Sequence, residues 1–191
     1  MSNKTMLDAP MERNLFFTEQ VDQASISKLT QSIIKINDHD TSLKNHYALH
    51  NIEYNPKPIK IYIDSYGGYV YQCFGLLSVM ENSETEIHTI VTGCAMSCGF
   101  MMLISGHKRF AHKLSTPLYH QVSSAAWGKL KDMEEDVEET KRLQVMLEEI
   151  TLRKTNISQK RLTEVFEKKF DWFMSAEEAK KLGVVDEIIK K

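Results

Sequence analysis

Two successive segments of this chain share one pattern, in which a β-branched run leads into a turn of small residues and then into an apolar run. In the first, a strand candidate at 59–63 and an apolar stretch at 70–80 flank a pair of glycines. In the second, a strand candidate at 87–91 precedes a small-residue turn and the apolar stretch 98–104. Each pattern predicts a buried strand, a sharp turn and a helix. Two such units in succession predict an α/β fold with parallel strands and functional turns at their carboxyl ends.

Ser97 lies in the second turn, where small residues crowd it against the start of the apolar run. This is the pattern of a nucleophile elbow, in which a strand stops, the chain turns sharply and a hydroxyl lies at a helix N-terminus. The N–H groups there stabilise the negative charge that acyl transfer generates on a carbonyl oxygen. Serine is also a favoured helix cap, and the local pattern alone favours that simpler interpretation.

Gly67 and Gly68 end the first strand candidate. Paired glycines let the backbone turn its amides towards a ligand. An isolated pair is more often only a tight turn. It therefore indicates a ligand-binding turn only in combination with the Ser97 turn.

The composition fits a soluble globular protein and argues against several function classes. The 191 residues, 42% hydrophobic and 26% charged, are enough for one domain with a buried core. A net charge of −2 without a basic stripe argues against a nucleic-acid partner. No apolar run nears the roughly 20 residues that span a bilayer, and the first residues lack the apolar core of a signal peptide. Three cysteines without framework spacing predict reduced thiols and a cytoplasmic setting.

The first third of the chain gives weaker signals. Residues 1–13 show no periodicity and are expected to form a flexible N-terminal segment, followed by a short strand at 14–17. An apolar stripe over 21–36 predicts a helix. Residues 37–58 are polar, contain two prolines and predict a long loop or an insertion.

Three histidines, His39, His46 and His50, lie in that polar stretch. His46 and His50 are four residues apart, as metal ligands on a helix are. No third ligand at a suitable spacing completes a zinc pattern, so we expect solvated loop histidines and no metal site.

The second half begins with short strand candidates at 109–111 and 117–122, and His120 lies in the second. A lone histidine at a strand end is usually structural unless a serine and a carboxylate join it. The small residues 123–128 are able to adopt an extended conformation. A long helix is predicted at 129–154, and at 1.5 Å per residue it spans roughly 38 Å. We expect it to project and to need a partner, the alternative being packing across the domain.

The C-terminal residues predict a helix at 157–166, then a helix that begins with a capping box at Ser175 and stops at Gly183, and a strand at 184–188. Asp171 lies between these helices, flanked by aromatic residues. An acid between bulky apolar groups must find a partner or shift its pKa. That partner is either an imidazole or a backbone amide.

Several segments, in family order, resemble the proteolytic subunit of the Clp protease, a self-compartmentalising serine peptidase. The matching segments are residues 13–17, 63–68, 93–103, 119–121 and 171–186. The resemblance implies the ClpP/crotonase-like α/β fold, with repeated strand–turn–helix units. It also implies a single domain at 14–191, from which a strand and long helix at about 123–154, the handle, project.

The resemblance implies a role for each matching residue. Ser97 would be the nucleophile, His120 the general base and Asp171 the orienting acid, while the backbone N–H groups of Gly68 and Cys98 would form the oxyanion hole. The chemistry of these residue types agrees. A serine needs a base at neutral pH, the histidine needs a carboxylate, and the tetrahedral intermediate needs two N–H donors.

The resemblance also implies partners. In this family the residues after the histidine pair with an extended peptide, so Ser123, Ser124 and Ala125 are the expected substrate-binding residues. The long helix interlocks two heptameric rings into a tetradecamer, which an AAA+ unfoldase feeds at the expense of ATP. The peptidase itself is expected to need no metal, nucleotide or other cofactor, and neither a nucleic acid nor a membrane is an expected partner.

The chain departs from the family pattern at several places. Tyr66 and Val122 stand where the family has prolines, and Phe170 stands where a basic residue linked to ring–ring contact is common. The N-terminal segment is short for an axial hairpin, and the 37–57 stretch is longer than usual. These differences bear on unfoldase docking, gating and ring state more than on the chemistry, and they suggest a divergent member.

Two other functions stay open at the level of sequence. A crotonase-type enzyme acting on acyl-coenzyme A shares the fold and two oxyanion amides but needs no triad. A non-catalytic ring or scaffold subunit also fits, because the departures fall at contact regions. Cys98 is an alternative nucleophile beside Ser97, but an elbow points adjacent side chains in different directions and no basic residue is evident near Cys98.

Overall fold

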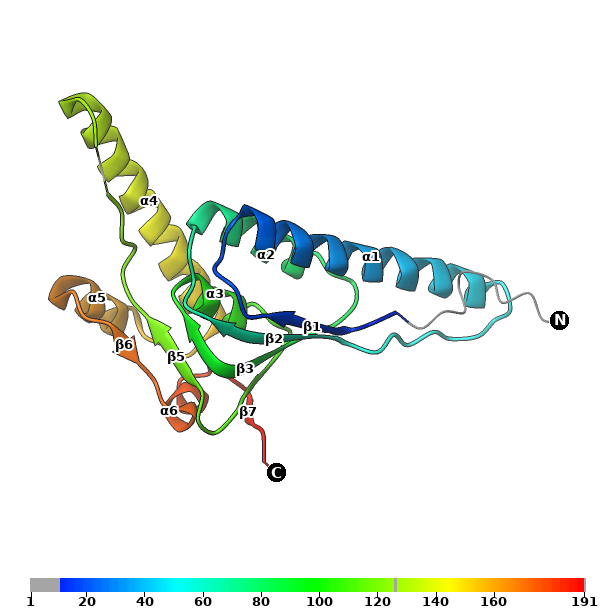
Figure 1. Ribbon diagram of the computed structural model, residues 1–191. Coiled ribbons are helices and arrows are strands. Elements are labelled where there is room, and N and C mark those ends of the chain that lie inside the picture. The colour runs from blue at the N-terminus through cyan, green and yellow to red at the C-terminus, as the bar shows by residue number, and fades with distance from the viewer. Residues whose placement is uncertain (1–10, 126, 191) are drawn as a thin grey trace.

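The computed structural model describes residues 11–125 and 127–190. Over these residues the chain forms one mixed sheet and six helices (Figure 1). The strands are β1 (Asn14–Phe17), β2 (Ile59–Ser65), β3 (Ile87–Met96), β4 (Lys108–Ala111), β5 (Thr116–Tyr119), β6 (Trp172–Phe173) and β7 (Glu187–Ile188). The helices are α1 (Gln23–Ala48), α2 (Val70–Glu81), α3 (Cys98–Ile104), α4 (Leu130–Lys154), α5 (Gln159–Lys168) and α6 (Ala176–Lys181).

The sheet is parallel in the order β1-β2-β3-β4-β7. Strand β3 is long and pairs with two neighbours on the same side, first with β4 and then, over Cys94–Met96, with β5. The short β6 then adds to β5 in the antiparallel direction. This branching carries the end of β3 away from the main sheet and towards the chain that follows β5.

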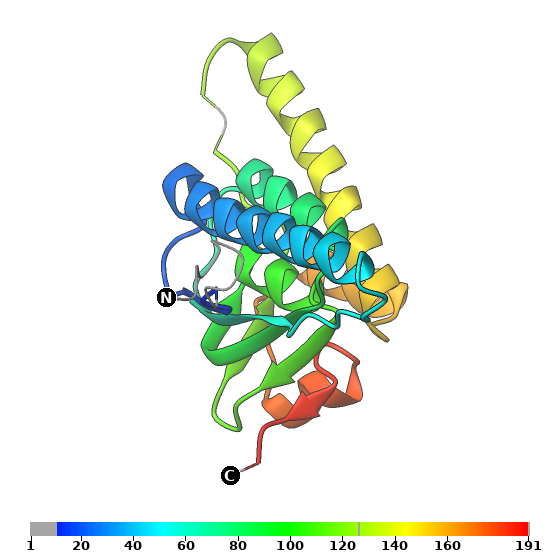
Figure 2. The same cartoon turned by 90° about the vertical axis from the view of Figure 1, so that its right-hand side faces the viewer.

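Both strand–turn–helix units predicted from the sequence are confirmed as β2–α2 and β3–α3. Strand β2 alternates buried and exposed or half-buried residues, as expected for a strand with one face towards the core. Helix α3 is buried along its whole length, which explains its continuous apolar sequence. Helices α1 and α2 lie side by side over one face of the sheet (Figures 1 and 2).

The polar stretch at 37–57 was expected to be a loop, and this prediction is wrong for its first half, because α1 continues to Ala48. The stripe of buried residues on α1 ends at Asp40, a polar residue that occupies a core-facing position. Beyond it the helix is mostly exposed and has no apolar period to detect. The connecting loop is therefore only about residues 49–58.

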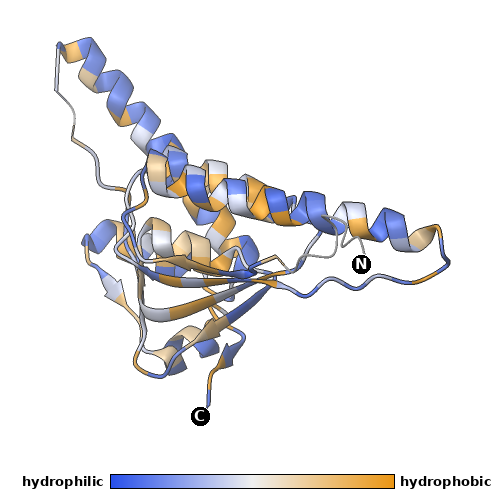
Figure 3. Ribbon diagram, turned by 45° about the vertical axis from the view of Figure 1, so that its right-hand side comes forward, coloured by the Kyte–Doolittle hydropathy of each residue, from blue (hydrophilic) through white to orange (hydrophobic). Residues whose placement is uncertain are grey.

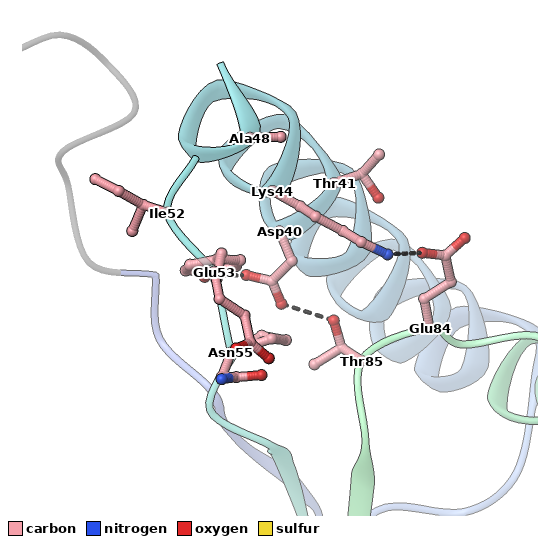
Figure 4. A pocket seen from close by; sticks show the side chains of 11 residues that line it. Asp40, Thr41, Lys44, Ala48, Ile52, Glu53, Asn55, Glu84 and Thr85 are labelled. Atoms are coloured by element: carbon pink, nitrogen blue, oxygen red, sulfur yellow. Dashed lines mark hydrogen bonds and ion pairs between the residues drawn. The ribbon is translucent and has the colours of Figure 1, made fainter. Parts of the chain in front are cut away.

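Asp40 is 4% exposed and is neutralised by an ion pair with Arg13. The Thr85 hydroxyl also donates to Asp40, which tethers α1 to the segment before β3 (Figure 4). The flexible segment expected at 1–13 stays a prediction, and Arg13 at its end forms this ion pair. Residues 1–10 lie outside the described residues.

The long helix α4 matches the predicted bounds within one residue and projects from the body of the molecule (Figures 1 and 3). Its buried residues all lie in the C-terminal half, from Leu143 to Thr151. Its N-terminal half exposes Leu130, Met133 and Val137. Projection, rather than packing across the domain, is therefore the arrangement in this chain.

Other boundaries differ from the sequence expectations. Strand β5 ends at Tyr119, so His120 follows the strand instead of lying within it. Strand β7 covers only Glu187–Ile188, although Val184 and Val185 are buried beside it. Across the part of the chain that the structure describes, no helix is both long and apolar enough to cross a membrane.

Candidate active site

The glycine turn after β2 packs directly against the end of β3. Gly67 has φ +94°, and a Cβ atom at this position would lie 2.6 Å from the Met96 carbonyl oxygen and 2.7 Å from Ser97 Cβ. Gly68 has φ +150°, and a Cβ atom there would lie 2.3 Å from the Val21 carbonyl oxygen. Only glycine avoids both the strained backbone and the collision. The two predicted turns therefore meet in space.

Ser97 has the strained backbone of an elbow. Its φ of +54° and ψ of −121° lie outside the regions that residues other than glycine usually adopt, at a cost of about 1–3 kcal/mol. The Ser97 N–H donates to the Leu118 carbonyl oxygen at 3.1 Å, which ties the elbow to β5. Its side chain makes no capping hydrogen bond to α3, so the simple helix-cap interpretation is wrong.

His120 and Asp171 are brought together by the β5–β6 pairing. Tyr119 pairs with Trp172, so the residues immediately beyond this pair face each other. His120 Nδ1 lies 3.9 Å from Asp171 Oδ1. That distance is longer than a hydrogen bond and makes an ion pair when the imidazole is protonated. The Met174 N–H also donates to the Pro117 carbonyl oxygen at 2.9 Å, which supports this register.

One pocket collects five of the residues predicted from sequence, namely Gly68, Ser97, Cys98, His120 and Ser123. The other residues that line it are Val70, Met101, Tyr119, Gln121, Val122 and Leu147. Neither the Gly68 N–H nor the Cys98 N–H donates to a backbone carbonyl in the described residues. Both amides are therefore available beside the Ser97 hydroxyl.

The pocket is not fully arranged for reaction in the single chain. Among the described residues, no hydrogen bond joins Ser97 Oγ to His120, and the Asp171 side chain is 60% exposed. Catalytic hydrogen bonds are often long before a substrate binds. An exposed acid also pairs weakly with its histidine, because water screens the charges.

The expected substrate-binding residues have different positions. Ser123 lines the pocket, whereas Ser124 contributes to a neighbouring hollow between α4 and the end of α5. Ser123, Ser124 and Ala125 are exposed and belong to no strand in this chain. Their backbone is therefore free to pair with another strand.

Sequence reasoning missed two residues that support the site. Gln144 on α4 is 7% exposed, and its Oε1 accepts the Val122 N–H at 2.8 Å. Its sequence signal is a polar residue at a core-facing position of an amphipathic helix. Arg161 on α5 stacks over the rings of Phe170 and Trp172, with its guanidinium carbon 5.3 and 4.3 Å from the two centroids. These rings flank Asp171.

Metal-ligating residues do not gather anywhere in the described part of the chain. His46 near the end of α1 and His50 in the turn after it contact each other edge to face, with ring centroids 5.4 Å apart, and both are exposed. A separate hollow beside α1 is lined by Asp40, Lys44 and Glu84 among others (Figure 4). It shares no lining residue with the pocket at Ser97.

Comparison with known proteins gives two findings. The Clp protease family matches residues 3–191 of this chain. The ATP-dependent Clp protease proteolytic subunit of Deinococcus radiodurans is 35% identical over 138 residues, which cover 71% of this chain and 67% of that protein.

Proposed function

This chain belongs to the Clp protease family and is a serine-type endopeptidase, and we propose that it cleaves polypeptides through an acyl-enzyme formed on Ser97. The observation that carries the proposal is the shared pocket of Ser97, His120, Gly68 and Cys98. Asp171 behind His120 supplies the third group of a triad. The order Ser, His, Asp along the chain is compatible with this chemistry, because a triad depends on geometry and not on chain order.

In the proposed reaction, Ser97 Oγ attacks the scissile carbonyl carbon while His120 accepts the hydroxyl proton. The protonated imidazole then gives this proton to the leaving amine, and an ester on Ser97 remains. Water, activated by His120, hydrolyses the ester and frees Ser97. Asp171 orients the imidazole and stabilises its protonated form.

The amides of Gly68 and Cys98 are the proposed oxyanion hole. Charge develops on the substrate carbonyl oxygen during both attacks, and preorganised N–H donors stabilise it without further rearrangement. The Gly68 amide comes from the turn after β2 and the Cys98 amide from the N-terminus of α3. The close packing of Gly67 on Ser97 supports a fixed relation between these two donors.

We propose that the substrate is an extended polypeptide bound along residues 123–125. Their exposed backbone suits strand addition, which recognises main-chain groups and gives loose sequence selectivity. Such selectivity fits degradation of unfolded chains better than cleavage at one defined sequence.

The proposed assembly is a pair of heptameric rings joined through α4. The exposed apolar residues on the outer half of α4 support an interface there, because an isolated helix rarely keeps such a stripe in water. The relative from Deinococcus radiodurans is named as part of an ATP-dependent protease. An AAA+ unfoldase is accordingly the proposed partner of this chain, and the cytoplasm its proposed location.

The test is labelling of the assembled protein with a serine-directed fluorophosphonate, followed by peptide mapping. Modification of Ser97, and loss of fluorogenic-peptide cleavage in Ser97→Ala, are expected. Equal turnover by wild type and Ser97→Ala would leave only a scaffold role. Hydrolysis of an acyl-coenzyme A without labelling of Ser97 would instead favour crotonase-type chemistry.

A further inference from the structure

Two thiols lie behind the Ser97 elbow, and the proposed reaction uses neither sulfur. Cys73 belongs to α2 and is 0% exposed, and Cys98 is the first residue of α3 and is 2% exposed. Cys73 Sγ donates to the Cys98 carbonyl oxygen at 3.6 Å. Neither thiol is part of a disulfide. They form one dithiol cluster.

The Cys98 sulfur is linked to the glycine turn as well. Its thiol donates to the Gly68 carbonyl oxygen at 3.2 Å. Gly68 is the residue whose N–H is proposed to hold the oxyanion, and it cannot shift freely because Val21 backs it closely. A chemical change at the Cys98 sulfur therefore acts on both sides of the proposed oxyanion hole.

The two sulfurs differ in reactivity. The neighbouring Cys73 thiol lowers the pKa of Cys98, and the backbone at Gly68 and the Ser97 side chain lower it further, against the opposing effect of burial. The same contact and burial raise the pKa of Cys73. Thiolates, not thiols, react with peroxides. These directions favour Cys98 as the attacking thiol and Cys73 as the resolving thiol.

Access favours the same assignment. Cys98 lines the Ser97 pocket, and Cys73 does not. A peroxide, little larger than water, reaches Cys98 from this side. The third cysteine, Cys94, lines neither this pocket nor the dithiol cluster, and burial together with Asp64 raises its pKa to about 11.

We propose that Cys73 and Cys98 form a reversible disulfide on exposure to a peroxide, and that this bond switches the Ser97 site off. First, Cys98 Sγ attacks one peroxide oxygen: an S–O bond forms, the O–O bond breaks and, for hydrogen peroxide, water leaves. Next, Cys73 Sγ attacks the sulfenic sulfur: the S–S bond forms, the S–O bond breaks, and the Cys73 proton leaves with hydroxide as a second water. Two thiols are oxidised and one peroxide is reduced.

The expected loss of activity follows from the contacts that the disulfide removes. The Cys98 thiol loses its hydrogen bond to the Gly68 carbonyl oxygen, and the Cys73 thiol loses its hydrogen bond to the Cys98 carbonyl oxygen. The new covalent bond ties the first residue of α3 to α2, directly after the strained Ser97. The effect on activity rests on the proposed function, whereas the disulfide itself does not.

The experiment exposes the assembled, reduced protein to hydrogen peroxide and follows two readouts. Non-reducing peptide mapping after thiol alkylation is expected to show a Cys73–Cys98 link and the loss of two hydrogen atoms from the intact chain. Cleavage of a fluorogenic peptide is expected to fall at least tenfold and to return after dithiothreitol. Cys94→Ala is the matched control and should behave like wild type in both readouts.

Cys73→Ala separates the two steps. Without a resolving thiol, Cys98 is expected to proceed to sulfinic acid, so that dithiothreitol no longer restores activity. Both thiols staying alkylatable after peroxide treatment of wild type, or a link to Cys94 instead, would overturn the proposal. A Cys73–Cys98 disulfide with undiminished cleavage would overturn the switch. Failure of the proposed function is distinguishable, because fluorophosphonate would then not label Ser97 in the reduced protein.

Discussion

His120 and Asp171 face each other as the next positions of an antiparallel ladder, directly beyond the pair Tyr119 and Trp172. Their Nδ1 and Oδ1 atoms lie 3.9 Å apart. Backbone pairing thus sets the relation between the proposed base and acid, and their side chains must come closer to reach hydrogen-bond distance. Ring assembly or substrate binding is the step at which we expect this approach.

Asp171→Asn should reduce kcat by about 100- to 10,000-fold, because the amide favours the wrong tautomer of His120 and does not stabilise its protonated form. The measurement is steady-state cleavage of a fluorogenic peptide by the assembled protein. Glu177→Gln, an exposed carboxylate in the first turn of α6, is the control and should keep wild-type activity. Similar kinetics for the two variants would remove Asp171 from the mechanism.

Gly67→Ala should destabilise the fold by about 2 kcal/mol or more and should reduce cleavage, because its Cβ collides with backbone and its φ of +94° becomes strained. Gly75→Ala is the matched control. It lies on exposed α2 surface, with nothing within 4 Å of the added Cβ, and should stabilise the chain by about 0.5–1 kcal/mol. Thermal unfolding measures both changes, and a tolerated Gly67→Ala would contradict the close contact between the two turns.

Gln144→Met should raise KM by about tenfold with a smaller change in kcat, since the half-buried Val122 N–H loses its acceptor and the following residues 123–125 lose their anchor. The substituted side chain keeps a similar volume, so the packing of α4 should survive. Gln159→Met, which removes an exposed bond to Glu148, is the control. A Gln144→Met enzyme with an unchanged KM would argue against a role for residues 123–125 in holding the peptide.

The elements and site residues that sequence predicted well are those with a local physical signal. The runs that became β2, β3 and α3 are apolar and end at small residues, so both turns could be located. Their proximity could not be deduced, because it depends on the fit of Gly67 against Ser97. Resemblance to a family, not periodicity, joined His120 and Asp171 to Ser97.

The failures have equally specific causes. The helix predicted at 21–36 ends too early because Asp40 interrupts the apolar period at a core-facing position of α1. Its partner Arg13 lies 27 residues earlier in the chain. Gln144 was missed for the same reason, because it is a polar residue at a core-facing position of α4. The contact between Cys73 and Cys98 joins residues from two separate strand–turn–helix units. Buried polar groups with distant partners leave no periodic trace in a sequence.

Asp40→Asn should destabilise the fold by about 3 kcal/mol at neutral pH, which corresponds to roughly 6–12 °C in Tm. Asp40 accepts hydrogen bonds from Arg13 at 2.8 Å, Tyr54 at 2.8 Å and Thr85 at 2.6 Å. The amide leaves the half-buried Arg13 without a counter-charge. Asp38→Asn, two residues earlier on the exposed side of α1, is the control and should unfold like wild type.

The pH dependence of unfolding gives the sharper form of this test. Burial alone would raise the pKa of Asp40, but the bonds from Arg13, Thr85 and Tyr54 outweigh it and hold the pKa below its ordinary value of 3.8. A lowered folded-state pKa stabilises the protein above the unfolded-state value and loses that stabilisation as pH falls towards the folded-state value. The stability gap between wild type and Asp40→Asn should therefore be constant above about pH 5 and should shrink below 3.8. Urea unfolding at a series of pH values measures the gap, and a gap that widens on acidification would show that the Asp40 carboxylate does not hold α1 in place.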